Sequence, residues 1–182
     1  QTSNDAHILT YEEKQQYRDM EPWQAYEKAC SLLHVRPHKT LIELLSSVSW
    51  NEEKWDLRGL YLGNKGIVPV LHIISCNQSL QVLVLAGTGL SNANLDLLAI
   101  SLESLHFLTY LDIGNNPITM VSLKRLQAML HSCEHLLRID IAKTPLAEVT
   151  FKTKLLRRRV VVIYFLLNVE STFLVLSSLC SR

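Results

Sequence analysis

A regular spacing of apolar residues runs through the middle of the chain. Three segments, beginning at Leu80, Leu108 and Leu136, share the pattern LxxLxLxx(N/T)xL, in which x is any residue. Their starting positions differ by 108 − 80 = 28 and 136 − 108 = 28 residues. Three consecutive matches at one period are typical of a structural repeat.

Each repeat predicts a strand followed by a helix. The LxL core alternates with a period of two residues, which indicates a short strand with one buried face. Strands are expected at 83–85, 111–113 and 139–141, parallel and adjacent. Their inward side chains, expected to be buried, are Leu83, Leu85, Leu111, Ile113, Ile139 and Ile141. Apolar residues then recur at helical spacing, and Ser91 and Thr119 stand where helix N-caps are expected.

The same frame continues less clearly toward both ends of the chain. One period upstream it begins at Glu52, where Leu60 replaces the Asn or Thr of the pattern. Gly66 then falls at the turn before the next helix, and we expect a structural glycine there. One period downstream the frame begins at Tyr164 and places Leu167 at a buried strand position. This segment is either a fifth, degenerate repeat or an apolar tail.

These 28-residue units resemble the ribonuclease-inhibitor-like class of leucine-rich repeats. The resemblance covers roughly residues 52–150. It implies an α/β solenoid, with parallel strands on a concave face and helices on a convex face, that binds protein partners. It does not imply ribonuclease inhibition, because that inhibitor is longer and far richer in cysteine.

Residues 1–50 do not fit the repeat and read as three short helices. Thr10–Glu13 and Thr40–Glu43 have the spacing of a capping box, and Pro22 is suited to open a helix. We expect these helices to cap the first repeat, although a separate docking module is an alternative. The predicted organisation is therefore a helical cap at 1–50, four repeats at 51–160 starting near 52, 80, 108 and 136, and the fifth repeat or tail at 161–182.

Composition narrows the class of protein. Hydrophobic residues make up 48% of the 182 residues and charged residues 19%, which is too apolar for a disordered chain. The net charge of +1 gives no overall field that would favour nucleic acid. The four cysteines, none in a CxxC pair, indicate reduced thiols rather than a disulfide framework.

Two clusters could be considered for metal binding, and neither has the spacing of a zinc site. Cys30, His34 and His38 are four residues apart, but Pro37 interrupts the helix that would align them. His131-x-Cys133-x-His135 more resembles the end of a repeat helix. Because structural zinc requires four ligands in tighter pairs, we expect neither metal nor cofactor. The chain also has no HExxH, GxSxG or phosphate-binding loop, so we expect no catalytic residues.

The sharper candidate is the exposed side of the strands. Charged residues recur between the buried leucines, and Asp112 and Asp140 are expected side by side, pointing outward on the concave face. With an aromatic residue nearby, such a face suits protein binding, although solvated strand residues are the simpler interpretation. The predicted partner-binding residues are Lys54, Asp56, Arg58, Tyr110, Asp112, Arg138 and Asp140.

The C-terminal part of the chain allows three interpretations. Its basic cluster consists of Lys152, Lys154, Arg157, Arg158 and Arg159. This cluster is either the solvated side of a repeat helix, or it precedes a membrane anchor at 160–180, or it belongs to a poorly packed terminus. An anchor is disfavoured because Asn168 and Glu170 would each cost about 2–3 kcal/mol on insertion.

The sequence thus predicts a non-enzymatic interaction module, a scaffold, adaptor or regulatory subunit. Its partner is another protein, bound on the concave face, and neither nucleic acid nor a membrane. The alternative is a regulatory repeat fragment of a larger protein, such as an innate-immune receptor, a GTPase-activating protein or a cytoskeletal regulator. Residues 1–5 are polar and do not predict a signal peptide, so we expect a cytoplasmic or nuclear location.

Overall fold

The protein is a mixed α/β structure built on one parallel sheet. The computed structural model describes residues 9–146 in full and the backbone of residues 162–164. The strands are β1 (Lys54–Asp56), β2 (Val82–Val84), β3 (Tyr110–Asp112), β4 (Arg138–Asp140) and β5 (Val162–Tyr164). They pair in chain order, and every neighbouring pair is parallel. Parallel neighbours require a crossover between strands, and helices supply the first three crossovers.

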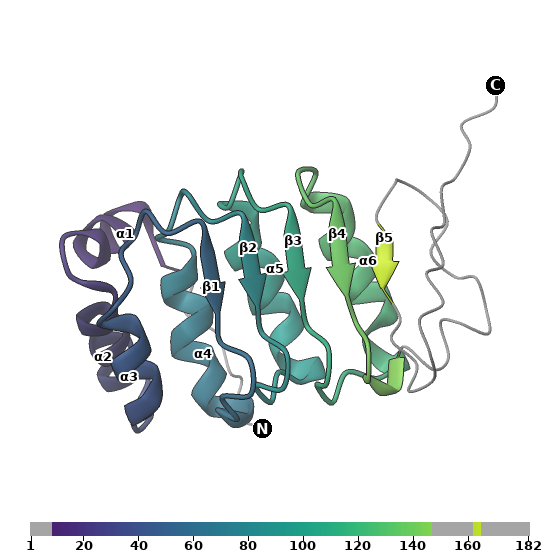
Figure 1. The fold of residues 1–182 in the computed structure, drawn as a ribbon, viewed down its shortest axis with the longest axis horizontal. Helices are drawn as coiled ribbons and strands as arrows, with labels where there is room; N and C mark the ends of the chain where they lie inside the picture. Colours follow the sequence, from purple (N-terminus) through teal and green to yellow (C-terminus); the bar gives the residue numbers. More distant parts are fainter. Residues whose placement is uncertain (1–8, 147–161, 165–182) are drawn as a thin grey trace.

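The helices lie on one side of the sheet and at one end of it. The helices that follow β1, β2 and β3 are α4 (Gly63–Ile74), α5 (Leu95–Glu103) and α6 (Leu123–Ser132). Short 3₁₀ turns, η1 (Asn92–Asn94) and η2 (Met120–Ser122), lead into the last two helices. All three helices run behind the sheet in Figure 1, and no described element covers its opposite face, which we name the open face.

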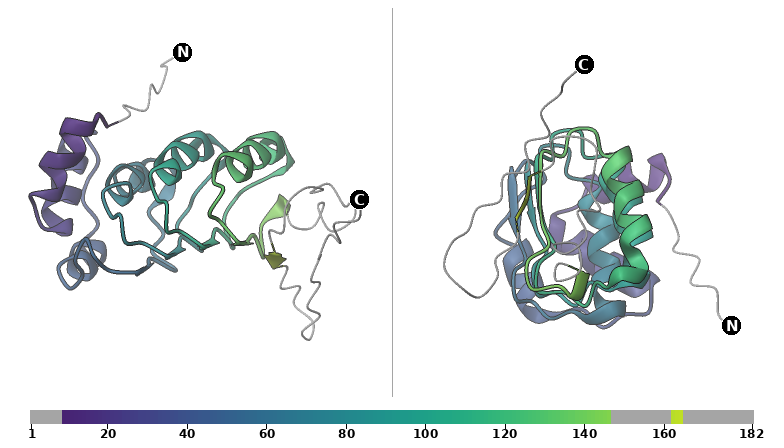
Figure 2. Two further views of the ribbon diagram at one scale, coloured as in Figure 1. Left: turned by 90° about the horizontal axis from the view of Figure 1, so that it is seen from above. Right: turned by 90° about the vertical axis from the view of Figure 1, so that its right-hand side faces the viewer.

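Three further helices precede the sheet, as the sequence predicted. They are α1 (Tyr11–Arg18), α2 (Pro22–Leu32) and α3 (Lys39–Leu45). Together they lie at the β1 end of the molecule, where α2 contacts α4 (Figure 2, left). The capping box at Thr10 and Glu13 is confirmed in both directions. The second predicted box is wrong, because α3 begins one residue before Thr40 and its N-cap is His38.

The predicted strand register is confirmed to within one residue at each boundary. Lys54 pairs with Val82, Val82 with Tyr110, and Tyr110 with Arg138, and each step is 28 residues. The side chains expected to be buried between sheet and helices, all 0% exposed, are Leu83, Leu85, Leu111, Ile113, Ile139 and Ile141. The core is therefore a continuous layer of leucine and isoleucine side chains, and each 28-residue unit adds its own buried residues to this layer.

Two expectations about spacing are wrong. The fifth strand exists, but Ile163 pairs with Ile139, so it lies four residues before the position of Leu167 that the 28-residue frame predicts. Gly66 lies inside α4 rather than before it. The glycine required by backbone geometry is Gly63, with φ of +73°, whose Cα lies 2.8 Å from the Cβ that Gly89 would carry as alanine. The close approach of the two turns leaves no space for a side chain at Gly89, and the positive φ favours glycine at Gly63.

Asparagine and threonine close the turns after the strands. Asn116 is 2% exposed, and its amide nitrogen donates to the carbonyls of Leu85, Ile113 and Gly114. Its side-chain oxygen accepts from the backbone N–H groups of Gly89 and Leu90. Asn116 therefore ties the turn after β3 to the turn after β2.

The threonines at the equivalent positions make more local contacts. Thr88 donates its hydroxyl to the carbonyl of Leu85, and Thr144 donates to that of Ile141. The residues expected as N-caps stand at those positions: Ser91 caps η1 with its side chain, and Thr119 precedes η2 without a side-chain capping bond.

Candidate binding face

The open face presents side chains of β1 to β4 in two rows, because successive strands are in register. The first row is Lys54, Val82, Tyr110 and Arg138, and the second is Asp56, Val84, Asp112 and Asp140. Arg58 follows β1 at the same edge of the sheet. The structure therefore brings all seven predicted binding residues onto one face, with Asp112 and Asp140 as direct neighbours.

The aspartates of the second row bind the backbone of their own turns. The N–H of Arg58 donates to Oδ1 of Asp56, with a distance of 3.2 Å. The corresponding distances are 2.9 Å from the N–H of Gly114 to Asp112 and 2.8 Å from that of Ala142 to Asp140. Each aspartate thus satisfies a backbone donor where the chain leaves the strand, a standard role of this side chain at turns.

Burial of these carboxylates corrects the expectation that they point into solvent. The side chain of Asp112 is only 10% exposed, and the whole residue Asp140 is 8% exposed. Val84, which stands between Asp56 and Asp112 in the row, is 1% exposed. Sequence spacing identifies the outward side of a strand, but neighbouring strands decide how much of each outward side chain meets water.

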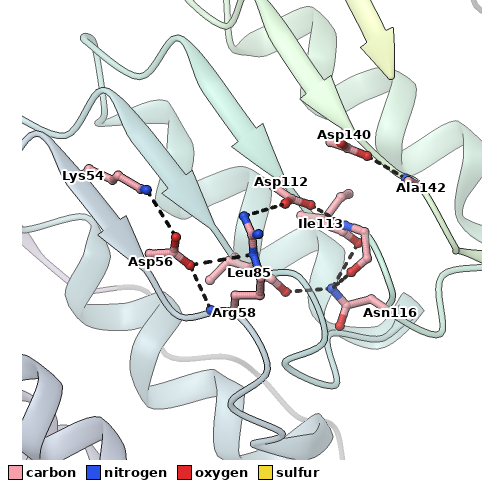
Figure 3. A network of polar contacts seen from close by, with 10 residues as sticks. Lys54, Asp56, Arg58, Leu85, Asp112, Ile113, Asn116, Asp140 and Ala142 are labelled. Carbon is pink, nitrogen blue, oxygen red and sulfur yellow. Dashed lines mark hydrogen bonds and ion pairs between the residues drawn. The ribbon is translucent and has the colours of Figure 1, made fainter. Parts of the chain in front are cut away.

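The cations are the accessible charges of this face. The side chains of Lys54 and Arg58 are 58% and 64% exposed. Lys54 Nζ lies 3.2 Å from Oδ2 of Asp56, and Arg58 Nη2 reaches across β2 to within 3.8 Å of Oδ2 of Asp112 (Figure 3). Arg58 Nε lies 4.0 Å from Oδ1 of Asp56. The guanidinium of Arg58 therefore links the acidic groups of two strands without a close hydrogen bond to either.

Tyr110 and Arg138 form a stacked pair at the other end of the first row. The guanidinium carbon of Arg138 lies 4.8 Å from the centroid of the Tyr110 ring, which is a cation–π distance. Burial, and then the nearby Asp112, raise the pKa of the Tyr110 hydroxyl above its usual range. The ring is thus half-buried and held by its neighbour, and it offers a rigid contact that remains neutral at physiological pH.

Asp140 is an acid of the face whose pKa is raised. Burial raises the pKa of its carboxyl above the ordinary value, and the charge of Asp112 raises it further. The hydrogen bond from Ala142 and the charges of Arg138 and Arg58 act in the opposite direction. The two adjacent carboxylates therefore coexist because backbone donors and arginines partly compensate their repulsion.

The two groups weighed as metal ligands do not converge. Cys30 is buried in α2, whereas that helix ends at Leu32 and His34 follows in a left-handed conformation with φ of +53°. Among the described residues, no three His, Cys, Asp or Glu side chains gather as a metal site would require. His135 instead lies edge-on to His106, with 5.9 Å between ring centroids, in a pocket between the ends of α5 and α6.

The cysteines of the described region are free thiols. Cys30 and Cys76 are buried and Cys133 is partly exposed. Burial raises the pKa of Cys76 to about 11 and also raises that of the other two. Because the thiolate is the reactive form, none of the three is activated as a nucleophile.

The C-terminal segments for which the sequence allowed three interpretations lie largely outside the described residues. These segments are the basic cluster at 152–159 and most of the apolar run at 160–180. Within the described residues, no helix is both long and apolar enough to cross a membrane.

One role was missed by the sequence reasoning, namely the turn-forming contact of the aspartates. The signal was present: Asp56, Asp112 and Asp140 each stand at the end of a strand, two residues before the N–H group that they accept. Comparison of the chain with family models, curated proteins and solved structures found no match. The geometry and chemistry of the open face are therefore the basis of the functional conclusion.

Proposed function

We propose that this chain is a leucine-rich-repeat protein of the ribonuclease-inhibitor-like class that binds another protein through the open face, without catalysis. The 28-residue period of the sequence equals the step between paired residues of β1 to β4, which supports a repeat architecture. A solenoid of this kind offers its strands as an extended surface for partners.

The observation that carries the proposal is the composition of the open face. Charged side chains and an aromatic ring from β1, β3 and β4 lie in register, and no described element covers them. Interfaces are enriched in tyrosine and arginine, and both are present here as the stacked pair of Tyr110 and Arg138. A cytoplasmic or nuclear setting is part of the proposal, since it suits the free thiols.

The test is affinity purification of the tagged full-length protein with quantitative identification of what co-purifies. The face variant combines Tyr110→Ala with Arg58→Glu. The matched control combines Val121→Ala with Lys124→Glu, because both residues are exposed on the helical side of the molecule. Substitution of Asp112 is avoided, since it would remove the contact with the N–H of Gly114.

We expect specific partners to be lost from the face variant and retained by the control, while both variants melt within a few degrees of the wild type. An unchanged set of partners in the face variant contradicts the proposal. Loss of the same partners from both variants would also contradict it, because binding would then not depend on the open face.

A further inference from the structure

We propose that the partner segment bound by the open face is acidic and extended, and that it is read at the carboxyl edge of the strands by Arg58 and Lys143. This inference rests on the proposed function and specifies the chemistry of its partner. The adjacent acids Asp112 and Asp140 would by charge alone favour a basic partner, but their contacts point to the opposite choice.

The first step is that the acids of the face are already used. One oxygen each of Asp56, Asp112 and Asp140 accepts a backbone N–H of its own turn. Two of these residues are also nearly covered, at 7% and 8% exposure. A basic side chain of a partner would therefore find only Asp56 readily accessible, and that carboxylate already pairs with Lys54.

The second step is that Arg58 is accessible and its donors are not fully engaged. Its distances of 3.8 Å and 4.0 Å to Asp112 and Asp56 are longer than a charge-assisted hydrogen bond of about 2.7–2.9 Å. The acids orient the guanidinium over the sheet without saturating it. A carboxylate arriving from solvent can accept two parallel N–H bonds from such a group.

The third step is a second cation at the same edge. The turns after β1, β2, β3 and β4 place a residue with positive φ at one equivalent position, and these residues are Gly59, Gly87, Asn115 and Lys143. Lys143 is exposed and has φ of +57°. A lysine in this conformation costs roughly 1–2 kcal/mol relative to the usual backbone regions, a cost that a glycine would avoid.

The separation of the two cations sets the spacing in the partner. Arg58 follows β1 and Lys143 follows β4, three strand spacings away, which is about 14 Å. An extended chain advances about 3.3 Å per residue, so two carboxylates about four residues apart would reach both cations. The positions equivalent to Arg58 in the three later turns carry the small residues Ala86, Gly114 and Ala142, so no large side chain occupies them.

The small overall charge of the face gives little long-range attraction for a partner, so we expect the partner to be recognised through direct contacts. Four cations, Lys54, Arg58, Arg138 and Lys143, stand against three acids, Asp56, Asp112 and Asp140, so the net charge of this set is only +1. Discrimination between partners then depends on which groups solvent and ligand can reach, and those groups are mainly cationic.

The experiment selects binders from a displayed library of random 12-residue peptides on the immobilised full-length protein. Synthetic, fluorescein-labelled copies of the selected peptides are then titrated by fluorescence anisotropy against the variants. We expect the peptides to carry two Asp or Glu residues about four positions apart. Arg58→Gln and Lys143→Gly should each weaken binding about tenfold, the loss of one strong charge-assisted contact.

Lys143→Gly makes the test robust, because the glycine is expected to relieve backbone strain and raise the melting temperature. Weaker binding by a more stable variant cannot result from unfolding. Lys124→Gln, on the outer surface of α6, removes the same charge from the opposite side and should leave binding unchanged.

The outcomes separate this inference from the proposed function. Basic or uncharged peptides that lose binding with Tyr110→Ala would overturn the acidic partner and leave the open face as the binding surface. Peptides of any charge that bind equally to wild type, Arg58→Gln, Lys143→Gly and Tyr110→Ala would overturn both. Acidic peptides weakened equally by Lys124→Gln would overturn the inference, since the attraction would then be non-specific.

Discussion

The units of β3 and β4 have the same backbone design and different polar side chains. Both place a buried aliphatic residue between two outward positions, and both end in an aspartate that accepts the N–H two residues later. The turn of β3 then uses Asn115 and Asn116, whereas that of β4 uses Lys143 and Thr144. The buried positions are thus interchangeable, and the turns give each unit its individual character.

The consequence is a difference in how each unit is tied to its predecessor. Asn116 makes five hydrogen bonds, three of them to Leu85, Gly89 and Leu90 in the preceding unit. The hydroxyl of Thr144 donates within its own turn, to the carbonyl of Ile141, and the N–H of Leu146 donates to the carbonyl of Ile118 in the preceding unit. The side chain of Asn116 therefore ties its turn directly to the turn after β2.

The largest effect is expected at the buried positions, where the two units should behave alike. Leu111→Ala and Ile139→Ala should each lower the free energy of unfolding by about 2–5 kcal/mol, because both side chains are 0% exposed and their truncation removes buried apolar contacts. Urea denaturation of each variant measures this loss. A cost below 1 kcal/mol at either position would contradict the equivalence of the two units.

The asparagine turn should be more sensitive than the threonine turns. Asn116→Ala removes the acceptor of two buried N–H groups, so we expect a loss of roughly 2–4 kcal/mol of stability. Thr144→Val keeps the shape and removes one hydroxyl donor, for an expected loss of about 1 kcal/mol.

Thr88→Val is the matched control for the threonine prediction, since Thr88 makes the same bond within the turn after β2. All three variants are compared by thermal melting and urea denaturation. Equal costs for Asn116→Ala and Thr144→Val would show that coupling between turns does not distinguish the two units.

A glycine should improve the β4 turn. Lys143→Gly relieves about 1–2 kcal/mol of left-handed backbone strain, and the greater flexibility of glycine in the unfolded chain offsets about 0.5–1 kcal/mol. We therefore expect a net gain of about 0.5–1 kcal/mol, measured as a higher melting temperature. Asn115→Gly is the comparison in β3 and should gain less, because asparagine tolerates this conformation. A lower melting temperature for Lys143→Gly would contradict the strain argument.

The smallest effect concerns the buried acid of β4. Because the pKa of Asp140 is raised in the folded state, its protonated form favours folding, and this contribution is lost as the pH rises through the folded pKa. Asp140→Asn keeps an oxygen to accept the N–H of Ala142 and removes the repulsion by Asp112. At pH 7 it should gain ~0.2–1 kcal/mol of stability, typical of relieving adjacent like charges.

The gain from Asp140→Asn should shrink as the pH falls toward 4, where wild-type Asp140 is itself increasingly protonated. Melting temperatures of both proteins between pH 4 and pH 8 measure the trend. A gain that grows toward low pH would have the wrong sign and would exclude an elevated pKa for Asp140.

The sequence by itself determined the parallel strands, their 28-residue register and the identity of the inward residues. These features are local and repeated: alternation places Leu111 and Ile139 on one side of their strands wherever the strands lie. The three N-terminal helices and the capping box at Thr10 were also readable, because caps and helical periodicity act within a few residues.

Only the tertiary structure decided which outward residues solvent reaches. The side chain of Asp112 is only 10% exposed and lies near Arg58. Arg58 is 54 positions earlier in the sequence and follows a strand two strands away. Likewise the pairing of Ile163 with Ile139 departs from the periodic frame, and Gly63 rather than Gly66 takes the strained turn beside Gly89. Such properties depend on contacts between distant segments, and those contacts have no fixed spacing in the chain.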